Sequence, residues 1–326
     1  MNRILYRTTT AALLVTLGIA HAPPASAQSP PVKTTVTYRE VDGHKILLDV
    51  LRPEGNDVRP VIVWIHGGAL IMGNREGIDP HVSALAQENG YALVSIDYRL
   101  APETKLPELI SDIEAAFRWL SDAGVKQFHL DTDRIVVAGG SAGGYLTLVT
   151  GYRVQPRPKA LVALYGYGDL IGDWYSTPSP HPCHNPRKIT REEAEQQTDG
   201  TIISDAGQRK GNGGLIYLYY RQQGIWPREV SGFDAATIAE KIAPFEPVRN
   251  VTPDYPPTLL MHGTKDTDVP FEESLMMVQQ FEKHGVSHLL KRIENGEHGF
   301  GGGDPQHIAD AYKTMREFVV KHLSAK

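Results

Sequence analysis

The chain has 326 residues and a formal net charge of −5, from 33 lysine and arginine residues against 38 aspartate and glutamate residues. Its composition, 41% hydrophobic and 22% charged, is near the average of soluble globular proteins and excludes fibrous and largely disordered chains. The negative balance and the lack of a stripe of basic residues argue against a nucleic-acid partner, because a polyanion would be repelled.

Residues 1–27 have the order of regions found in a secretory signal peptide. Arg3 and Arg7 precede an apolar run, Ala11 to Ala20, and the small residues Ala25-Ser26-Ala27 follow it. The run is about half of the ~20 residues that a membrane span needs. We therefore predict cleavage near Ala27, an exported (periplasmic or secreted) protein, and no stable membrane span after the signal is removed. An uncleaved anchor or an unstructured tail is the alternative.

Residues 28–326 alternate between strand-like and helix-like segments and are predicted to form one catalytic domain. Val32–Val41 and Lys45–Arg52 alternate apolar and polar residues, which indicates an antiparallel pair with one solvent-exposed face. Short apolar runs predict buried parallel strands at Val61–His66, Ala92–Asp97, Ile135–Gly139, Ala160–Tyr165 and Thr258–His262, with a strand-like His288–Ile293. Helical patterns occupy His81–Glu88, Pro107–Ala123, Ala142–Tyr152, Glu272–His284 and Pro305–Leu323. The alternation predicts an α/β fold, a mostly parallel sheet with helices on both faces.

One long segment, Tyr167–Asn250, interrupts this alternation. It has no clean strand, is rich in glycine, proline and aromatic residues, and contains a charged helical stretch, Thr190–Gln197. A long excursion between two core strands is usually a lid or a binding segment, so we predict that residues 167–250 form an inserted lid or cap. The alternative is an insertion that only packs and does not contact substrate.

A candidate nucleophile lies in Gly139-Gly140-Ser141-Ala142-Gly143. A predicted strand runs directly into this sequence and a helix follows it near Gly143. A serine at such a turn has a strained backbone, and the positions two before and two after it must be nearly free of side chains. The helix N-terminus adds a partial positive charge where an oxyanion would form. We predict that Ser141 is a nucleophile; an ordinary glycine-rich turn is the alternative.

A serine hydroxyl needs a base to take its proton, and the base needs a group that orients it. The strand Thr258–Met261 is followed by His262-Gly263-Thr264-Lys265-Asp266, and the strand-like His288–Ile293 is followed by Gly296-Glu297-His298-Gly299-Phe300. The order serine, aspartate, histidine along the chain is the one that a sheet of this kind uses. We predict His298 as the base and Asp266 as the acid.

Other residues compete for these roles. Asp268 is a rival acid, and Asp254 is a weaker one. His262 is expected to brace its own turn. His181-Pro182-Cys183-His184 resembles a metal-binding cluster, but Pro182 and the lack of a paired ligand group favour an ordinary loop. We expect neither a metal nor an organic cofactor.

Backbone amides for an oxyanion hole are expected in two places. The strand that starts at Val61 ends in the glycine loop His66-Gly67-Gly68-Ala69. Amides of Gly67, Gly68 or Ala69 are predicted to converge with that of Ala142. A plain turn is the alternative.

In this order along the chain, the motifs resemble those of α/β-hydrolases, in particular the hormone-sensitive-lipase-like and acetyl-esterase branch. The motifs are His66-Gly67-Gly68, Asp97-Tyr98-Arg99-Leu100-Ala101-Pro102-Glu103, Gly139-Gly140-Ser141-Ala142-Gly143-Gly144, His262-Gly263-Thr264-Lys265-Asp266 and Glu297-His298-Gly299. The resemblance covers about Pro60–Tyr165 and Pro257–Leu323. It implies an α/β-hydrolase fold and a serine carboxylic-ester hydrolase that forms an acyl-enzyme.

The sequence departs from this family pattern at two points. Ala69 stands where many members have a third glycine, and Tyr167–Asn250 matches no motif of the family. An amidase, a formamidase or a serine peptidase would use the same three residues, and a non-catalytic ligand binder on the hydrolase scaffold is a further alternative. The expected partner is a small-molecule ester, whose acyl and alcohol groups stay open, as does the oligomeric state.

Overall fold

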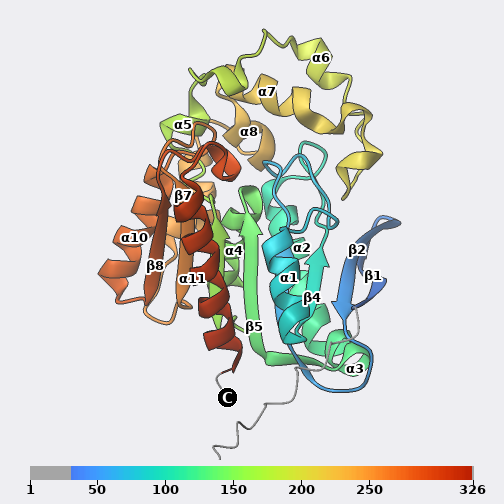
Figure 1. Ribbon diagram of the computed structural model, residues 1–326. Helices are drawn as coiled ribbons and strands as arrows, with labels where there is room; N and C mark the ends of the chain where they lie inside the picture. Colours follow the sequence, from blue (N-terminus) through green and yellow to red (C-terminus); the bar gives the residue numbers. More distant parts are fainter. Residues whose placement is uncertain (1–30, 325–326) are drawn as a thin grey trace, which may run out of the picture.

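The computed structural model describes residues 31–324, and the predicted signal peptide, residues 1–27, lies outside this range. Within it, an eight-stranded sheet has the order β1-β2-β4-β3-β5-β6-β7-β8 (Figure 1). The strands are β1 Val32–Val41, β2 His44–Arg52, β3 Arg59–Ile65, β4 Ala92–Ile96, β5 Leu130–Gly140, β6 Ala160–Leu164, β7 Thr258–Gly263 and β8 His288–Ile293. The β1–β2 and β2–β4 pairs are antiparallel and all other pairs are parallel. The predicted fold class is confirmed.

Both faces of the sheet are covered by helices, as predicted for a parallel sheet. Helices α1 Pro80–Asn89 and α11 Pro305–Ser324 pack on one face, in front of the sheet in Figure 1. Helices α2 Leu106–Trp119, α4 Ala142–Arg153 and α10 Glu272–His284 pack on the other. The central strands between these layers consist largely of apolar residues, and every residue of β4 and β6 is buried.

The segment between α2 and β5 differs from the prediction. The helix predicted to end at Ala123 continues from α2 through a π-helical turn, Leu120–Gly124, into α3 Val125–Phe128. Strand β5 then begins at Leu130 rather than at Ile135. Leu130 and Asp131 pair with Arg59 and Pro60 at the start of β3, and the register then shifts before Ile135, so backbone pairing extends the strand beyond its apolar core.

Residues 167–250 fold as short helices and turns, and the part from 173 to 231 lies above the carboxyl ends of the parallel strands (Figure 1). The last residues pack beside α4, where Tyr145 and Arg153 donate to the carbonyls of Phe245 and Pro244. The helices are α5 Asp173–Ser176, α6 Arg191–Glu195, α7 Gly214–Gln223, α8 Trp226–Ser231 and α9 Ile238–Lys241, and the 3₁₀ turns are Pro182–His184, Ala206–Gln208, Lys210–Gly213, Ala243–Phe245 and Pro247–Arg249. The predicted charged helix is α6, which begins with a capping box between Thr190 and Glu193. We call residues 167–250 the insert.

Aromatic side chains fix the insert to the domain below it. Trp226 is buried, its ring stacks on Tyr175 with centroids 4.0 Å apart, and its indole N–H donates to the carbonyl of Ala69 at 3.1 Å. Ring contacts extend from Tyr175 to Trp174 and Tyr167, and we call these four residues the aromatic layer of the insert. Through Trp226 this layer is joined to the glycine loop.

Charged residues of the Asp97–Glu103 run have structural partners. The pairs are Asp97 with Arg75 at 2.7 Å, Arg99 with Asp112 at 2.7 Å, and Glu103 with Arg209 of the insert. Backbone pairing adds to this, because the Leu100 amide donates to the carbonyl of Ile203 at 2.9 Å. The run thus connects the core to the insert and has a structural role.

Two buried carboxyl groups hold the first residues of the insert. Glu273 of α10 accepts hydrogen bonds from the Gly168 and Asp169 amides at 3.1 and 3.0 Å, and Glu246 accepts one from the Leu170 amide at 3.1 Å. Burial, aided by the charge of Asp169, raises the pKa of Glu273 to about 8 and that of Glu246 to about 7. These contacts join the start and the end of the insert to α10.

Among residues 31–324, no helix combines the length and the apolar character needed to cross a bilayer.

The raised pKa of Glu273 predicts a pH-dependent loss of stability. Because this pKa is raised in the folded state, the stability that it contributes is fully present below the unfolded value of about 4.5 and is lost as the pH rises to about 8. Glu273→Gln retains a side-chain oxygen that can accept from the Gly168 and Asp169 amides, but it carries no charge. Between about pH 5 and pH 9, we expect the melting temperature of the variant to increase relative to that of the wild type. The expected change is roughly 2–4 °C for each kcal/mol of stability that the wild type loses over this range.

The matched control is Glu272→Gln, on the exposed side of the same helix. Calorimetric melting at both pH values tests the prediction, and a difference between Glu273→Gln and wild type that does not change with pH would contradict it.

Candidate active site

Ser141 stands alone between the end of β5 at Gly140 and the start of α4 at Ala142. Its backbone angles, φ 56° and ψ −123°, lie in a region that side-chain-bearing residues seldom occupy. Hydrogen bonds over-determine this conformation, because the Ser141 amide donates to the Leu164 carbonyl at 2.9 Å and its carbonyl accepts from the Tyr145 amide at 3.0 Å. The strained turn expected from the sequence is present.

Glycines on either side of Ser141 allow the strands and α4 to approach each other closely. A Cβ atom on Gly139 would lie 2.4 Å from the Gly143 carbonyl oxygen, and one on Gly143 would lie 2.0 Å from the Ile65 carbonyl oxygen. Neither position has room for a side chain, in agreement with the expectation for this motif.

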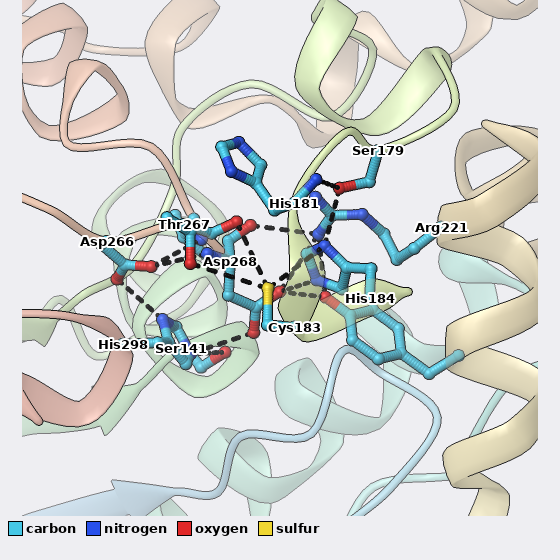
Figure 2. Close-up of polar contacts among 12 residues, drawn as sticks. Ser141, Ser179, His181, Cys183, His184, Arg221, Asp266, Thr267, Asp268 and His298 are labelled. Atoms are coloured by element: carbon cyan, nitrogen blue, oxygen red, sulfur yellow. Dashed lines mark hydrogen bonds and ion pairs between the residues drawn. The ribbon is translucent and has the colours of Figure 1, made fainter. Parts of the chain in front are cut away.

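The structure brings Ser141, His298 and Asp266 together at the carboxyl edge of the sheet (Figure 2). His298 Nε2 is 3.0 Å from Ser141 Oγ, and His298 Nδ1 is 2.8 Å from Asp266 Oδ2. The other oxygen of Asp266 accepts the amides of Asp268 and Val269 at 2.9 and 2.8 Å. The aspartate is thus fixed by its own loop, and the histidine is fixed by the aspartate.

The charges at this site favour an ionised acid beside a basic imidazole. Burial would raise the pKa of Asp266, but hydrogen bonds from His262 and His298 outweigh it and hold this pKa below its usual range. Burial would lower the pKa of His298, but Asp266 and Asp268 outweigh it and raise this pKa. With Nδ1–H donated to Asp266, the Nε2 lone pair of neutral His298 faces the Ser141 hydroxyl.

The rival residues have other contacts. Asp268 lies on the Nε2 side of His298, with Oδ2 at 3.6 Å, and not at Nδ1 where an orienting acid is needed. Asp254 is exposed and contacts Thr252. His262 is buried and bonds Val269 within its own turn at 3.0 Å, as expected.

The sequence His181-Pro182-Cys183-His184 forms a 3₁₀ turn at the edge of the site. Both ring nitrogens of His184 have protein partners, Ser179 Oγ at 2.7 Å and Asp268 Oδ1 at 2.8 Å. Over residues 31–324, no group of three or more histidine, cysteine, aspartate or glutamate side chains is arranged to hold a metal ion.

The glycine loop after β3 lies against Ser141. A Cβ atom on Gly67 would be 3.2 Å from the Ser141 Cβ, and Ala69 adopts a positive φ of 56°. In the described part of the chain, the amides of Gly67, Gly68, Ala69 and Ala142 have no acceptor. Within residues 31–324, the four amides predicted as oxyanion donors are therefore not engaged with a protein acceptor.

A cavity of about 860 Å³ opens beside His298. The core contributes Thr267, Asp268, Glu297 and His298 to its lining, and the insert contributes Pro182, Cys183, His184, Gln197, Gly211, Gly214, Leu215, Tyr217 and Leu218. Much of the wall thus comes from residues 167–250. Of the aromatic residues of the insert, only Tyr217 lines this cavity.

Comparisons with known proteins match the two halves of this site. The family model described as BD-FAE matches residues 48–170, and that of the prolyl oligopeptidase family matches residues 217–326. A Staphylococcus aureus protein of unknown function is 25% identical, with a TM-score of 0.70, over 90% of this chain and 99% of its own. A protein of Enterococcus faecalis described as a member of the alpha/beta hydrolase superfamily has a TM-score of 0.67 at 20% identity, over 89% of this chain and 99% of its own. The chain has an α/β-hydrolase fold.

An esterase of Pyrobaculum calidifontis is also similar to this chain, with 25% identity and a TM-score of 0.63 over 91% of this chain and 87% of its own. Among curated proteins, the non-reducing polyketide synthase ausA of Aspergillus calidoustus is 26% identical over 94% of this chain, and the 5-methylorsellinic acid synthase of Aspergillus terreus is 27% identical over 93%. The chain spans only 15% and 14% of the length of these two synthases.

Sequence reasoning missed a set of polar residues beside His298. Arg221 and Tyr217 of α7, with His184, surround the carboxylate of Asp268. The only sequence signal was the spacing of Tyr217 and Arg221, which places both on one face of a helix.

Proposed function

We propose that this α/β-hydrolase cleaves carboxylic esters through an acyl-enzyme, with Ser141 as nucleophile, His298 as base and Asp266 as the acid that orients it. The observation that carries the proposal is the continuous pair of hydrogen bonds from Ser141 Oγ through His298 to Asp266, at 3.0 and 2.8 Å. Side chains so connected, on a strained turn beside a cavity, have the geometry that activates a serine hydroxyl.

In the proposed reaction, His298 Nε2 takes the proton of the Ser141 hydroxyl while Oγ attacks the ester carbonyl. The resulting imidazolium gives that proton to the departing alcohol oxygen as the carbon–oxygen bond breaks, which leaves Ser141 acylated. His298 then takes a proton from water, whose oxygen attacks the acyl carbon, and returns it to Ser141 as the carboxylic acid leaves. The steps use no metal and no organic cofactor.

The oxyanion of each tetrahedral intermediate is assigned to backbone amides. Gly67, Gly68 and Ala69 lie on one side of Ser141, and Ala142 lies at the positive N-terminal end of α4. Amides without a protein acceptor need no rearrangement to bind the developing charge, and one such donor is worth about 3–4 kcal/mol. The methyl group at Ala69 leaves its N–H intact.

Ser141→Ala tests the central assignment. We expect hydrolysis of p-nitrophenyl acetate to fall by at least about a thousandfold, because the nucleophile is removed, while the melting temperature stays close to that of the wild type. Mass spectrometry after treatment with an organophosphonate probe should find the adduct on Ser141 in the wild type only.

Ser176→Ala, an exposed serine of the insert, is the control and should retain activity and labelling. Turnover that persists in Ser141→Ala would refute the assignment. A wild type that is neither labelled nor active would favour the non-catalytic binder.

A peptidase or amidase is the second candidate, because the prolyl oligopeptidase family model matches residues 217–326, which include Asp266 and His298. Such an enzyme would protonate an amine rather than an alcohol. Esters and anilides with the same acyl group distinguish the two: we expect kcat/KM to be far higher for p-nitrophenyl acetate than for p-nitroacetanilide. Comparable values would favour the amidase.

We also propose that the insert acts as a lid or cap that selects the substrate, because it supplies much of the cavity wall. Leu218 of α7 faces this cavity, and Leu218→Trp should narrow it. Across a panel of esters that vary in acyl length and alcohol size, we expect kcat/KM for the bulkiest esters to fall about tenfold relative to acetates.

Tyr219→Trp is the matched control, because Tyr219 lies next in the same helix but lines a different hollow. A folded Leu218→Trp variant with unchanged selectivity would contradict a selective role for the insert.

Export is a further part of the proposal. Its support is the order of charged, apolar and small residues in residues 1–27.

A further inference from the structure

The carboxylate of Asp268 is clamped by side chains of the insert (Figure 2). Its Oδ1 atom accepts hydrogen bonds from His184 Nε2 at 2.8 Å and from Arg221 Nη1 at 3.1 Å, and a third from the Tyr217 hydroxyl. All three donors come from residues 167–250, whereas Asp268 lies in the loop that carries Asp266. One oxygen atom therefore joins the insert to the loop of the proposed acid.

The second oxygen of Asp268 faces the proposed base. Asp268 Oδ2 is 3.6 Å from His298 Nε2, the same nitrogen that lies 3.0 Å from Ser141 Oγ. While His298 is neutral, Nε2 accepts from the serine and offers nothing to the carboxylate. Once Nε2 is protonated, its positive charge lies within ion-pair distance of Asp268. The interaction thus favours the imidazolium over the neutral ring.

Arg221 cannot easily move away from this arrangement. Its side chain is 2% exposed, and its guanidinium lies over the rings of Trp174, Tyr175 and Tyr217 at 5.4, 5.0 and 5.8 Å. Arg221 Nη1 also donates to the backbone carbonyl of Asp268 at 3.0 Å. The aromatic rings of the insert therefore hold the Arg221 guanidinium in place, and this guanidinium in turn holds the carboxylate of Asp268.

We propose, on the basis of the function assigned above, that Asp268 is a positioning residue through which the insert holds the Nε2 side of His298 and stabilises its imidazolium. Asp266 would orient the ring from Nδ1, and Asp268 would act on the opposite nitrogen. The insert would then affect the basicity of His298 as well as the shape of the cavity.

The charged and titratable groups around this pair come from every neighbouring element. The insert contributes Cys183, His184, Tyr217 and Arg221, the loop after β7 contributes Asp266, the loop after β8 contributes Glu297, and Tyr165 after β6 places its ring edge against His298. Glu297 is directed to the Thr267 amide and hydroxyl at 3.0 and 2.8 Å. Arg221 is the only guanidinium or ammonium group in this set.

These groups shift the pKa values of Asp268 and His298, some upward and some downward. Burial would raise the pKa of Asp268, but His184, His298, Tyr217 and Arg221 outweigh it and hold this pKa far below its usual range, so Asp268 stays ionised. For His298, burial and the charge of Arg221 act to lower the pKa, while Asp266 and Asp268 raise it. Removing the carboxylate of Asp268 should therefore lower the pKa of His298, whereas removing the guanidinium of Arg221 should raise it.

The test is the pH profile of kcat/KM, whose acid limb reports the base of the free enzyme. We expect Asp268→Asn, which keeps the size of the side chain, to move the midpoint of that limb down by about one pH unit. Arg221→Met should move it up. Asp266→Asn should instead lower activity by about ten thousandfold, because the ring loses its orienting acceptor.

Direct titration of the His298 ring by NMR in the same variants provides a measurement that needs no activity. An Asp268→Asn variant that is labelled at Ser141 but has an unshifted acid limb and an unshifted imidazole would overturn this proposal and leave the proposed function in place. If Asp268→Asn does not fold, an acid limb that is unchanged or lowered in Arg221→Met would overturn it. A larger loss in Asp268→Asn than in Asp266→Asn would reassign the acid and overturn both roles. Loss of labelling in the wild type would instead remove the function on which the proposal rests.

Discussion

The site depends on one imidazole that reaches two partners at once. His298 lies 3.0 Å from Ser141 Oγ and 2.8 Å from Asp266 Oδ2, and each of the three residues follows a different strand. Strands β5, β7 and β8 are parallel, so their carboxyl ends meet at one edge of the sheet. The parallel pairing is thus what converts three distant segments of sequence into one group of side chains.

Close packing beneath Ser141 is the second condition for this geometry. The glycines around the serine let β5, β3 and α4 approach at distances that exclude a Cβ atom, which lifts the hydroxyl out of the sheet. The same approach brings the amides of the glycine loop beside the serine. The glycine loop thus lies beside the proposed nucleophile, and its amides are the donors that we propose for the oxyanion.

The sequence was sufficient to predict the parts of this protein whose structure follows from local patterns of residues. Short β-branched runs gave the strands, and glycine-flanked motifs gave Ser141 and His298, because backbone strain and close approach restrict which residues fit. It was insufficient for the clamp on Asp268. That contact requires His184 and Arg221 to meet a loop far along the chain, and the packing of the insert has no periodic pattern from which to infer it.

The indole of Trp226 has a consequence for protein engineering. Its N–H donates to the carbonyl of Ala69, so the insert holds the glycine loop that lies against Ser141. A chimera that exchanged residues 167–250 for the corresponding segment of another hydrolase would change the cavity wall, but it would also release this grip. Grafts that preserve Trp226 and its stacking on Tyr175 are the ones in which substrate range and turnover can be altered separately.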